Sequence, residues 1–308
     1  MSFQSKRSFV ELVSTLQAMK KQEDDVYWCE NNAYVPKGHM GFLSSPETAP
    51  VDGFCRSRMI EWCFQVVDFC KFSRETVAIA ANYLDRYTHC SAEAINNRRS
   101  FQLASMTCLY TAIKIHEPQA MEPQTVSNMS RGVFSADEIT DMERKILAAL
   151  KWRVNPPTAI SFVHHYLDTV PENVLSSSER SAVFELSKLQ TEFAVKDSGF
   201  VTSKPSTIAL AALNNALTFA LPSSLLSDSI MGVVIQFADL HCNAFDLLDV
   251  KCRLFRGLET SVFTVSPGGT CSRTDVVCKQ QANSELLGSP RSVSVTTSQA
   301  YMNDPQLP

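Results

Sequence analysis

The stretch that most constrains this chain is residues 101–117, which read FQLASMTCLYTAIKIHE. Between Phe101 and Ile115 the only charged residue is Lys114, and no Pro or Gly interrupts the run. The run is too long for an ordinary strand and too short and polar for a membrane span. A helix that is apolar nearly all round is expected at the centre of a larger helical domain. Because a lysine is almost never buried without a partner, we expect Lys114 to emerge from the core or to meet an acceptor there.

Length and charge limit the class of protein. A chain of 308 residues with 44% apolar residues can build one large or two medium cores. The net charge of −4 argues against a nucleic-acid-binding protein, which would usually carry a basic patch. No apolar segment is long enough to span a membrane, and the start, MSFQSKRSFVELV, lacks the apolar core of a signal peptide. We therefore expect an intracellular protein with reduced cysteines, since no CxxC pair is present.

The helical periodicity predicts a repeated plan. Five helical patterns occupy roughly residues 55–152, the segment NPPT (155–158) breaks the chain, and five more patterns follow to about residue 257. The third pattern of the second set, residues 204–219, is again apolar nearly all round. We predict an all-α protein in four parts: an N-terminal helix and irregular lead-in (1–54), a five-helix unit (55–155), a second five-helix unit (156–261) and a disordered Ser/Thr-rich tail (262–308).

Four motifs carry a resemblance to a known family. They are RSRMIEW (56–62), ANYLDRY (81–87), AIKIHE (112–117) and DMERKILAALKWRVNPPT (141–158). In order and spacing they resemble the cyclin box, strongly over residues 55–158 and more weakly over 159–258. The resemblance implies two tandem cyclin folds and a nuclear and cytoplasmic regulatory subunit, without catalytic activity of its own, that binds a cyclin-dependent Ser/Thr kinase and controls cell-cycle progression. The ending KWRVNPPT leans weakly toward a D-like, G1-type subtype.

The same resemblance assigns a role to Lys114. In cyclins the lysine and glutamate that match Lys114 and Glu143 stand close together and hold the backbone of the mobile kinase helix. Apolar kinase contacts would come from Ile115, Leu147 and Val154. Long charged side chains at the edge of an apolar surface are suited to bonding a partner's backbone. A salt bridge between the two residues with no partner is the alternative, and the two interpretations are compatible.

Two further sets of residues follow from the resemblance. Arg56 and Asp85 are expected to form a buried salt bridge between the first two helices of the box. A groove for docking kinase substrates or inhibitors would involve Cys55, Arg58, Met59, Trp62, Gln65 and Gln102. Arg58 stands where an aliphatic residue is usual and Gln65 where an acid is usual, which would weaken attraction to a basic peptide. Met59 and Trp62 could instead be core residues or the edge of an apolar patch.

Other functions find little support in the sequence. No phosphate-binding glycine loop, HExxH motif or catalytic constellation is present, so we expect no cofactor, no metal and no enzyme activity. A cyclin-fold protein that acts in transcription, as a partner of a transcriptional kinase or as a factor that binds DNA, remains the alternative function. Ser266 and Ser289 precede prolines and match minimal phosphorylation sites, and Arg7–Val10 is a degenerate match to a destruction box.

Overall fold

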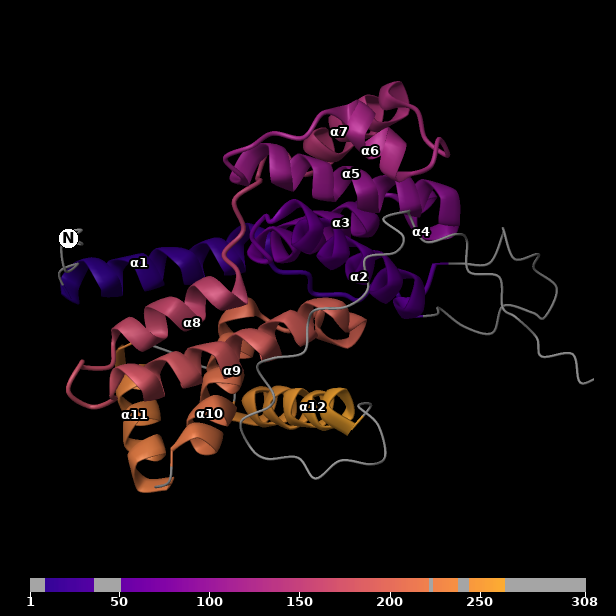
Figure 1. Ribbon diagram of the computed structural model, residues 1–308. Helices are drawn as coiled ribbons and strands as arrows, with labels where there is room; N and C mark the ends of the chain where they lie inside the picture. The colour runs from indigo at the N-terminus through magenta and orange to yellow at the C-terminus, as the bar shows by residue number, and fades with distance from the viewer. Residues whose placement is uncertain (1–8, 36–50, 222–223, 238–243, 264–308) are drawn as a thin grey trace, which may run out of the picture.

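The computed structural model describes residues 9–35, 51–221, 224–237 and 244–263, and this part of the chain is built from helices without a strand (Figure 1). No helix within it is both long and apolar enough to cross a membrane. The elements are α1 (Phe9–Gln22), η1 (Glu23–Tyr27), α2 (Gly53–Cys70), α3 (Glu75–Cys90), α4 (Ala92–Asn96), α5 (Arg98–His116), α6 (Pro123–Met129), α7 (Ala136–Ala149), α8 (Ala159–Asp168), α9 (Ser177–Lys196), η2 (Ser198–Phe200), α10 (Pro205–Ala220), α11 (Ser224–Phe237) and α12 (Ala244–Phe263).

Helix α5 is the centre of the first helical unit, as its apolar sequence predicts. Twelve of its nineteen residues are buried, and it packs against α2, α3, α4, α6 and α7. The helix begins where the side chain of Asn97 accepts a hydrogen bond of 3.0 Å from the Ser100 amide. Its last turn carries Lys114 and His116, which suit the negative end of the helix dipole. The core of the unit therefore surrounds α5, and the end that bears Lys114 reaches the surface.

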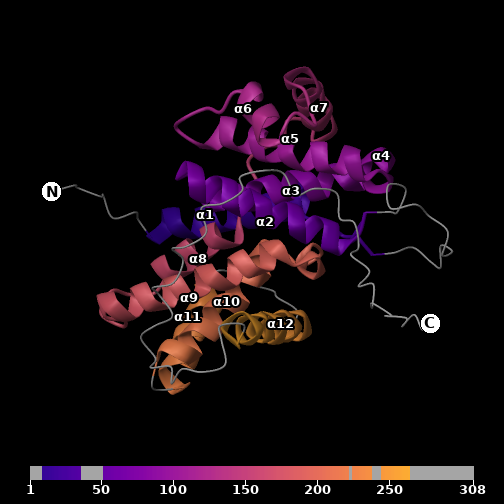
Figure 2. The same ribbon diagram turned by 45° about the vertical axis from the view of Figure 1, so that its right-hand side comes forward.

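Helix α10 has the same position in the second unit, where it contacts α8, α9, α11 and α12. Pro205 stands in its first turn, where the missing amide hydrogen costs nothing. Eleven residues between Ser206 and Leu217 are buried. Figure 1 shows the two units one above the other, and Figure 2 shows the same separation after rotation. The predicted all-α fold of two helical units is confirmed.

Several helix ends depart from expectation. Ser135 caps α7, and with Glu138 it forms a reciprocal capping box. Ser73 lies one residue before Arg74, the N-cap of α3; the Ser73 hydroxyl accepts from the Glu75 amide at 3.2 Å. The short helix α4 was not predicted, because it has only five residues. Helix α12 runs to Phe263, six residues beyond the predicted end at 257.

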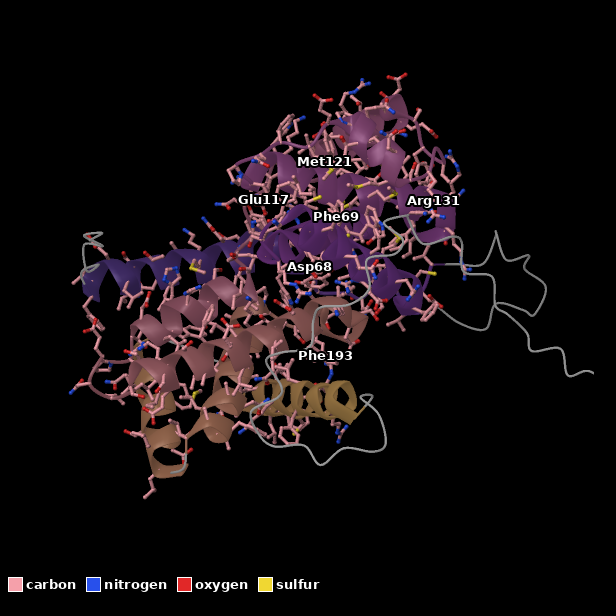
Figure 3. All side chains as sticks on the ribbon, in the orientation of Figure 1. Asp68, Phe69, Glu117, Met121, Arg131 and Phe193 are labelled. Atoms are coloured by element: carbon pink, nitrogen blue, oxygen red, sulfur yellow. The ribbon has the colours of Figure 1, made fainter. Side chains whose placement is uncertain are left out.

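The two units are joined by side chains that cross between them. Arg74, next to α3, pairs with Asp68 of α2 at 2.8 Å and with Glu192 of α9. Figure 3 labels Asp68 on the side of the first unit that faces α9. The N-terminal segment also contacts both units: the Trp28 indole donates to the Thr202 carbonyl at 2.8 Å. Residues 264–308 of the predicted tail, with Ser266 and Ser289, lie outside the described residues. The first two residues of the Arg7–Val10 match also lie outside them.

Candidate functional site

The site begins with an ion pair between α5 and α7. Lys114 Nζ lies 3.1 Å from both carboxylate oxygens of Glu143. The Lys114 ammonium also lies 5.5 Å from the centre of the Tyr110 ring, one turn earlier on α5. The structure therefore brings together the two residues that the sequence predicted as a pair, and each is held by the helix that carries it.

The two partners differ sharply in exposure. The Lys114 side chain is 47% exposed, whereas that of Glu143 is 9% exposed. Burial alone would lower the pKa of Lys114, but the hydrogen bond and the negative charge of Glu143 outweigh burial and raise the pKa. Lys114 is therefore charged at neutral pH. The pair presents a cationic N–H donor at the surface beside carboxylate oxygens that retain lone pairs for further bonds.

Apolar side chains surround the pair to different extents. Ile115 is 43% exposed, Leu147 is buried beside Glu143 on α7, and Val154 is half-buried after the end of α7. The Val154 carbonyl accepts hydrogen bonds from Tyr83 and from His116 at 2.9 Å, which fixes the backbone at this point. Of the three predicted apolar contacts, Ile115 presents the largest exposed fraction.

Trp152 is an exposed aromatic residue just after α7 and was not predicted as a site residue. It is 72% exposed, and its amide donates to the Leu147 carbonyl at 3.0 Å, so its backbone lies at the C-terminal end of α7, the helix that carries Glu143. Lys151 and Trp152 both have left-handed backbone, with φ of 52° and 58°. Such conformations are uncommon for residues other than glycine, asparagine and aspartate. The signal in the sequence is a Trp placed directly after the helical pattern, in KWRVNPPT.

The predicted Arg56–Asp85 pair is present between α2 and α3. Arg56 Nε and Nη2 each donate to a different carboxylate oxygen of Asp85 at 2.8 Å, and both side chains are nearly fully buried. Tyr34 adds a third hydrogen bond to Asp85 at 2.9 Å. Burial lowers the pKa of Arg56, but the facing carboxylate outweighs it and raises the pKa above the ordinary value. Arg56 also donates to the Val195 carbonyl at 2.8 Å, so the pair also ties α2 to α9 in the second unit.

The residues predicted for a docking groove divide into two groups. Cys55, Met59 and Trp62 are buried, and the Trp62 indole nitrogen has no hydrogen-bond partner among the described residues. Gln65 is exposed and Gln102 is half-buried. Arg58 is exposed but pairs with Glu61 at 2.8 Å on the same helix. The apolar members therefore pack in the first core, and only the polar members present much surface.

The described residues contain no group of three or more His, Cys, Asp or Glu side chains arranged to hold a metal ion. The cysteines in the same part of the chain are free thiols, and Cys63 and Cys108 are buried in the first core. Burial raises the pKa of Cys63 to about 12, so this thiol is protonated at neutral pH.

Comparison with known proteins supports the resemblance. Residues 23–155 match the family described as "Cyclin, N-terminal domain". Cyclin-D4-2 of Oryza sativa subsp. japonica is 31% identical over 184 residues, which cover 58% of this chain and 46% of the relative. Cyclin-A1-4 of the same organism is 25% identical over 219 residues, covering 71% and 57%. G1/S-specific cyclin-E1 of Rattus norvegicus is 30% identical over 118 residues, covering 38% and 28%.

The chain thus spans about half the length of the first of these curated relatives. Among solved structures, a viral cyclin from herpesvirus saimiri aligns with a TM-score of 0.58 at 14% identity, covering 80% of this chain and 99% of the viral chain. At that identity the alignment supports the fold alone. D-type relatives support the lean toward a D-like subtype only weakly, since A-type and E-type cyclins match at similar identity. Residues 23–155 therefore match the cyclin N-terminal domain, and the similar relatives are cyclins, so the comparisons support a cyclin family protein.

Proposed function

We propose that this chain is the regulatory subunit of a cyclin-dependent Ser/Thr kinase and acts in cell-cycle progression, in the nucleus and cytoplasm. The observation that carries the proposal is the surface around Lys114 and Glu143. It combines a partly exposed ion pair with the exposed side chain of Ile115, which follows Lys114 on α5, and in this proposal Trp152, exposed just after α7, extends the surface. An interface of this kind, with a charged bond beside aromatic and aliphatic contacts, is typical of the central part of a protein–protein contact.

The geometry suits the backbone of a partner helix. A helix terminus exposes amide N–H groups at one end and carbonyl groups at the other, and these need partners when they are buried. The Lys114 ammonium donates to carbonyl oxygens, and the Glu143 carboxylate accepts from amides, so the pair can satisfy both kinds of group. Because the Lys114 stem is anchored on α5 and Glu143 on α7, the two are already positioned before the partner arrives.

Activation then needs no chemistry from this chain. A kinase whose mobile helix has two positions is shifted toward the one that this surface binds more tightly. The active position brings the kinase's own lysine–glutamate ion pair and its metal-binding aspartate into place. In this proposal the chain contributes a rigid helical surface, and catalysis resides in the kinase.

Docking of substrates or inhibitors through Met59, Trp62, Gln65 and Gln102 is a finer proposal. In this proposal Gln65 and Gln102 supply the contacts at the surface, and the buried side chains of Met59 and Trp62 lie beneath them. With Gln65 and the already paired Arg58 at the surface, no carboxylate among the six predicted groove residues is available for a basic peptide residue. We expect such a groove to bind basic peptides weakly.

The test is a double substitution, Lys114→Ala with Glu143→Ala. Removing both partners leaves no unpaired buried charge, so the fold should persist. We expect binding to a cyclin-dependent kinase of the same organism to weaken by at least about 30-fold, which corresponds to about 2 kcal/mol. Binding is measured by calorimetry across a panel of purified kinases, and activation by phosphate transfer to a protein substrate.

The matched control is Lys188→Ala with Glu185→Ala on α9. This lysine–glutamate pair lies in the second unit with its charged atoms 3.9 Å apart, so it tests the loss of two charges elsewhere. The control variant should bind the kinase as the unchanged chain does. Wild-type affinity of the folded Lys114/Glu143 double variant would exclude this surface, and absence of binding to every kinase by the unchanged chain would exclude the function.

A further inference from the structure

A cavity of about 100 Å³ lies where three parts of the chain meet. The N-terminal segment contributes Tyr27 and Trp28, helix α3 of the first unit contributes Ala78 and Ala81, and the second unit contributes Phe200. Every residue that lines the cavity is buried or half-buried. The cavity therefore belongs to neither unit alone, and it is complete only while the N-terminal segment and both units are packed together.

Hydrogen bonds between the three parts hold the aromatic wall of this cavity in place. The Trp28 indole donates to the Thr202 carbonyl at 2.8 Å, which joins the N-terminal segment to the second unit. The Asn82 side chain of α3 donates to the Tyr27 carbonyl at 2.9 Å. The Tyr27 hydroxyl accepts from the Asn155 amide, in the linker between the units, at 3.2 Å. Because these groups are already positioned, a guest would pay little for ordering the wall.

The opposite wall is built from small side chains. Ala78 and Ala81 lie three positions apart on α3, so they share one face of that helix. Ala194 of α9 and Ala159 of α8 line the cavity from the second unit. Each of these side chains ends at its Cβ, which leaves the space between the units unfilled. A longer side chain at one of these positions would occupy the space, and this property supplies a direct test.

The charged groups in the wall neutralise each other. Arg56 and Asp85 are the two charged residues that line the cavity, and they are paired through two hydrogen bonds of 2.8 Å. Burial raises the pKa of the Cys29 thiol, which also lines the cavity, to about 12, so this thiol is uncharged at neutral pH. A charged guest would lose its hydration without meeting an unpaired opposite charge. The wall therefore favours an uncharged guest.

We propose that this cavity binds one small uncharged molecule built on a single five- or six-membered ring. A mainly apolar site between two domains, with a few polar groups, is the usual setting of a small-molecule site. An apolar cavity of about 150 Å³ holds benzene, and this smaller cavity sets a limit of about one ring. The guest would contact the N-terminal segment and both units at once, so its binding stabilises their arrangement by mass action. The inference does not depend on the kinase proposed above.

The test is binding of fluorobenzene to the full chain, followed by fluorine NMR and by thermal unfolding. We expect a Kd of about 1 mM, which lies within the range of affinities for a ligand of about seven heavy atoms. A probe concentration of about 10 mM should then raise Tm by about 3–6 °C. The anion 4-fluorobenzoate carries the same ring with a charge, and it should bind at least about tenfold more weakly.

A substitution that fills the cavity locates the probe. Ala78→Leu adds three carbon atoms to the wall, so it should weaken fluorobenzene binding at least about tenfold while leaving Tm unchanged or raised without the probe. The matched control is Ala182→Leu at an exposed position of α9 away from the cavity, and it should bind the probe as the unchanged chain does.

A second measurement needs no substitution. Fluorobenzene at about 10 mM should slow alkylation of Cys29 about tenfold, as followed by mass spectrometry, and should leave the exposed Cys252 unaffected. Absence of both a fluorine signal change and a rise in Tm at this concentration would overturn the proposal. Binding that survives Ala78→Leu and leaves Cys29 unprotected would place the probe elsewhere and would also overturn it. Equal affinity for 4-fluorobenzoate would refute the requirement for an uncharged guest.

Discussion

Substitution of Asp85 by alanine should destabilise the first unit strongly, because it leaves Arg56 charged and buried. Asp85 accepts two hydrogen bonds of 2.8 Å from Arg56 and one of 2.9 Å from Tyr34. Each bond to a charged group contributes about 1.5–3 kcal/mol. The carbonyl of Val195 stays within 2.8 Å of Arg56 and compensates in part. We therefore expect a loss of about 3–5 kcal/mol in the free energy of unfolding, in the range for broken buried pairs.

The assay is thermal unfolding followed by circular dichroism at pH 7. For a protein of this size 1 kcal/mol corresponds to about 2–4 °C in Tm, so Asp85→Ala should lower Tm by about 6–20 °C. Tyr34→Phe removes one hydrogen bond to the Asp85 carboxylate but leaves the ion pair, and should cost about 1.5–3 kcal/mol. The control is Asp141→Ala, which breaks an exposed aspartate–arginine pair and should shift Tm by less than about 2 °C.

The reasoning also predicts non-additivity. Arg56→Met and Asp85→Leu together remove both charges, so the double variant should be at least about 2 kcal/mol more stable than the sum of the two single losses. A shift in Tm below about 2 °C for Asp85→Ala would refute the argument. So would a double variant as unstable as the sum, since the cost would then come from lost packing rather than from an unpaired charge.

Three further predictions concern other positions. A Cβ at Gly257 would lie 2.2 Å from the ring of Phe193, which Figure 3 labels on α9, so Gly257→Ala should lower the free energy of unfolding by about 1–3 kcal/mol. Gly232 in α11 has open space around it, so Gly232→Ala should raise the free energy of unfolding by about 0.5–1 kcal/mol. Thermal unfolding measures both changes. Burial raises the pKa of Glu23 above 4.5, so the stability that Glu23 contributes is full below that pH and is lost as the pH rises through the folded pKa. Unfolding of the unchanged chain from pH 4.5 to 8 should show this fall, whereas Glu23→Gln, which cannot titrate at this position, should lack it; a rise in the unchanged chain would contradict the reasoning. Trp152→Ala should leave Tm within about 2 °C but weaken kinase binding about tenfold in the same calorimetry, and unchanged affinity would remove Trp152 from the surface.

The helices were predictable where periodicity and caps agree. The central helix α5 is apolar over most of its length, and the Ser135–Glu138 capping box marks the start of α7 in the sequence itself. The end of α12 was harder, because residues 258–263 show no breaker and only a weak pattern. The five-residue helix α4 was missed because so short a segment carries no periodic signal.

The contacts between the units could not be predicted from sequence. Arg56 donates to the backbone carbonyl of Val195, 139 residues away, and a carbonyl leaves no trace in the side-chain sequence. Glu23 is buried and accepts from the amide and hydroxyl of Ser206 at 2.7 and 2.6 Å, which satisfies the N-terminus of α10. Nothing in the local pattern of KKQEDD distinguishes Glu23 from its solvated neighbours. Such pairs depend on tertiary packing alone.

The Arg56–Asp85 and Lys114–Glu143 pairs both join a basic side chain to a carboxylate, and their consequences are opposite because their exposure differs. Arg56 and Asp85 are both buried, so their ion pair compensates for the hydration that both charges lose on folding. Loss of this pair should therefore lower the free energy of unfolding. The Lys114 side chain is 47% exposed, and a pair with so exposed a partner contributes at most about 1 kcal/mol to folding. The fold therefore gains little from holding Lys114 over Glu143, whereas a partner that buries the pair gains an oriented donor and acceptor. Loss of binding without loss of stability is accordingly the result that would identify this surface as functional, and equal loss of both would identify it as structural.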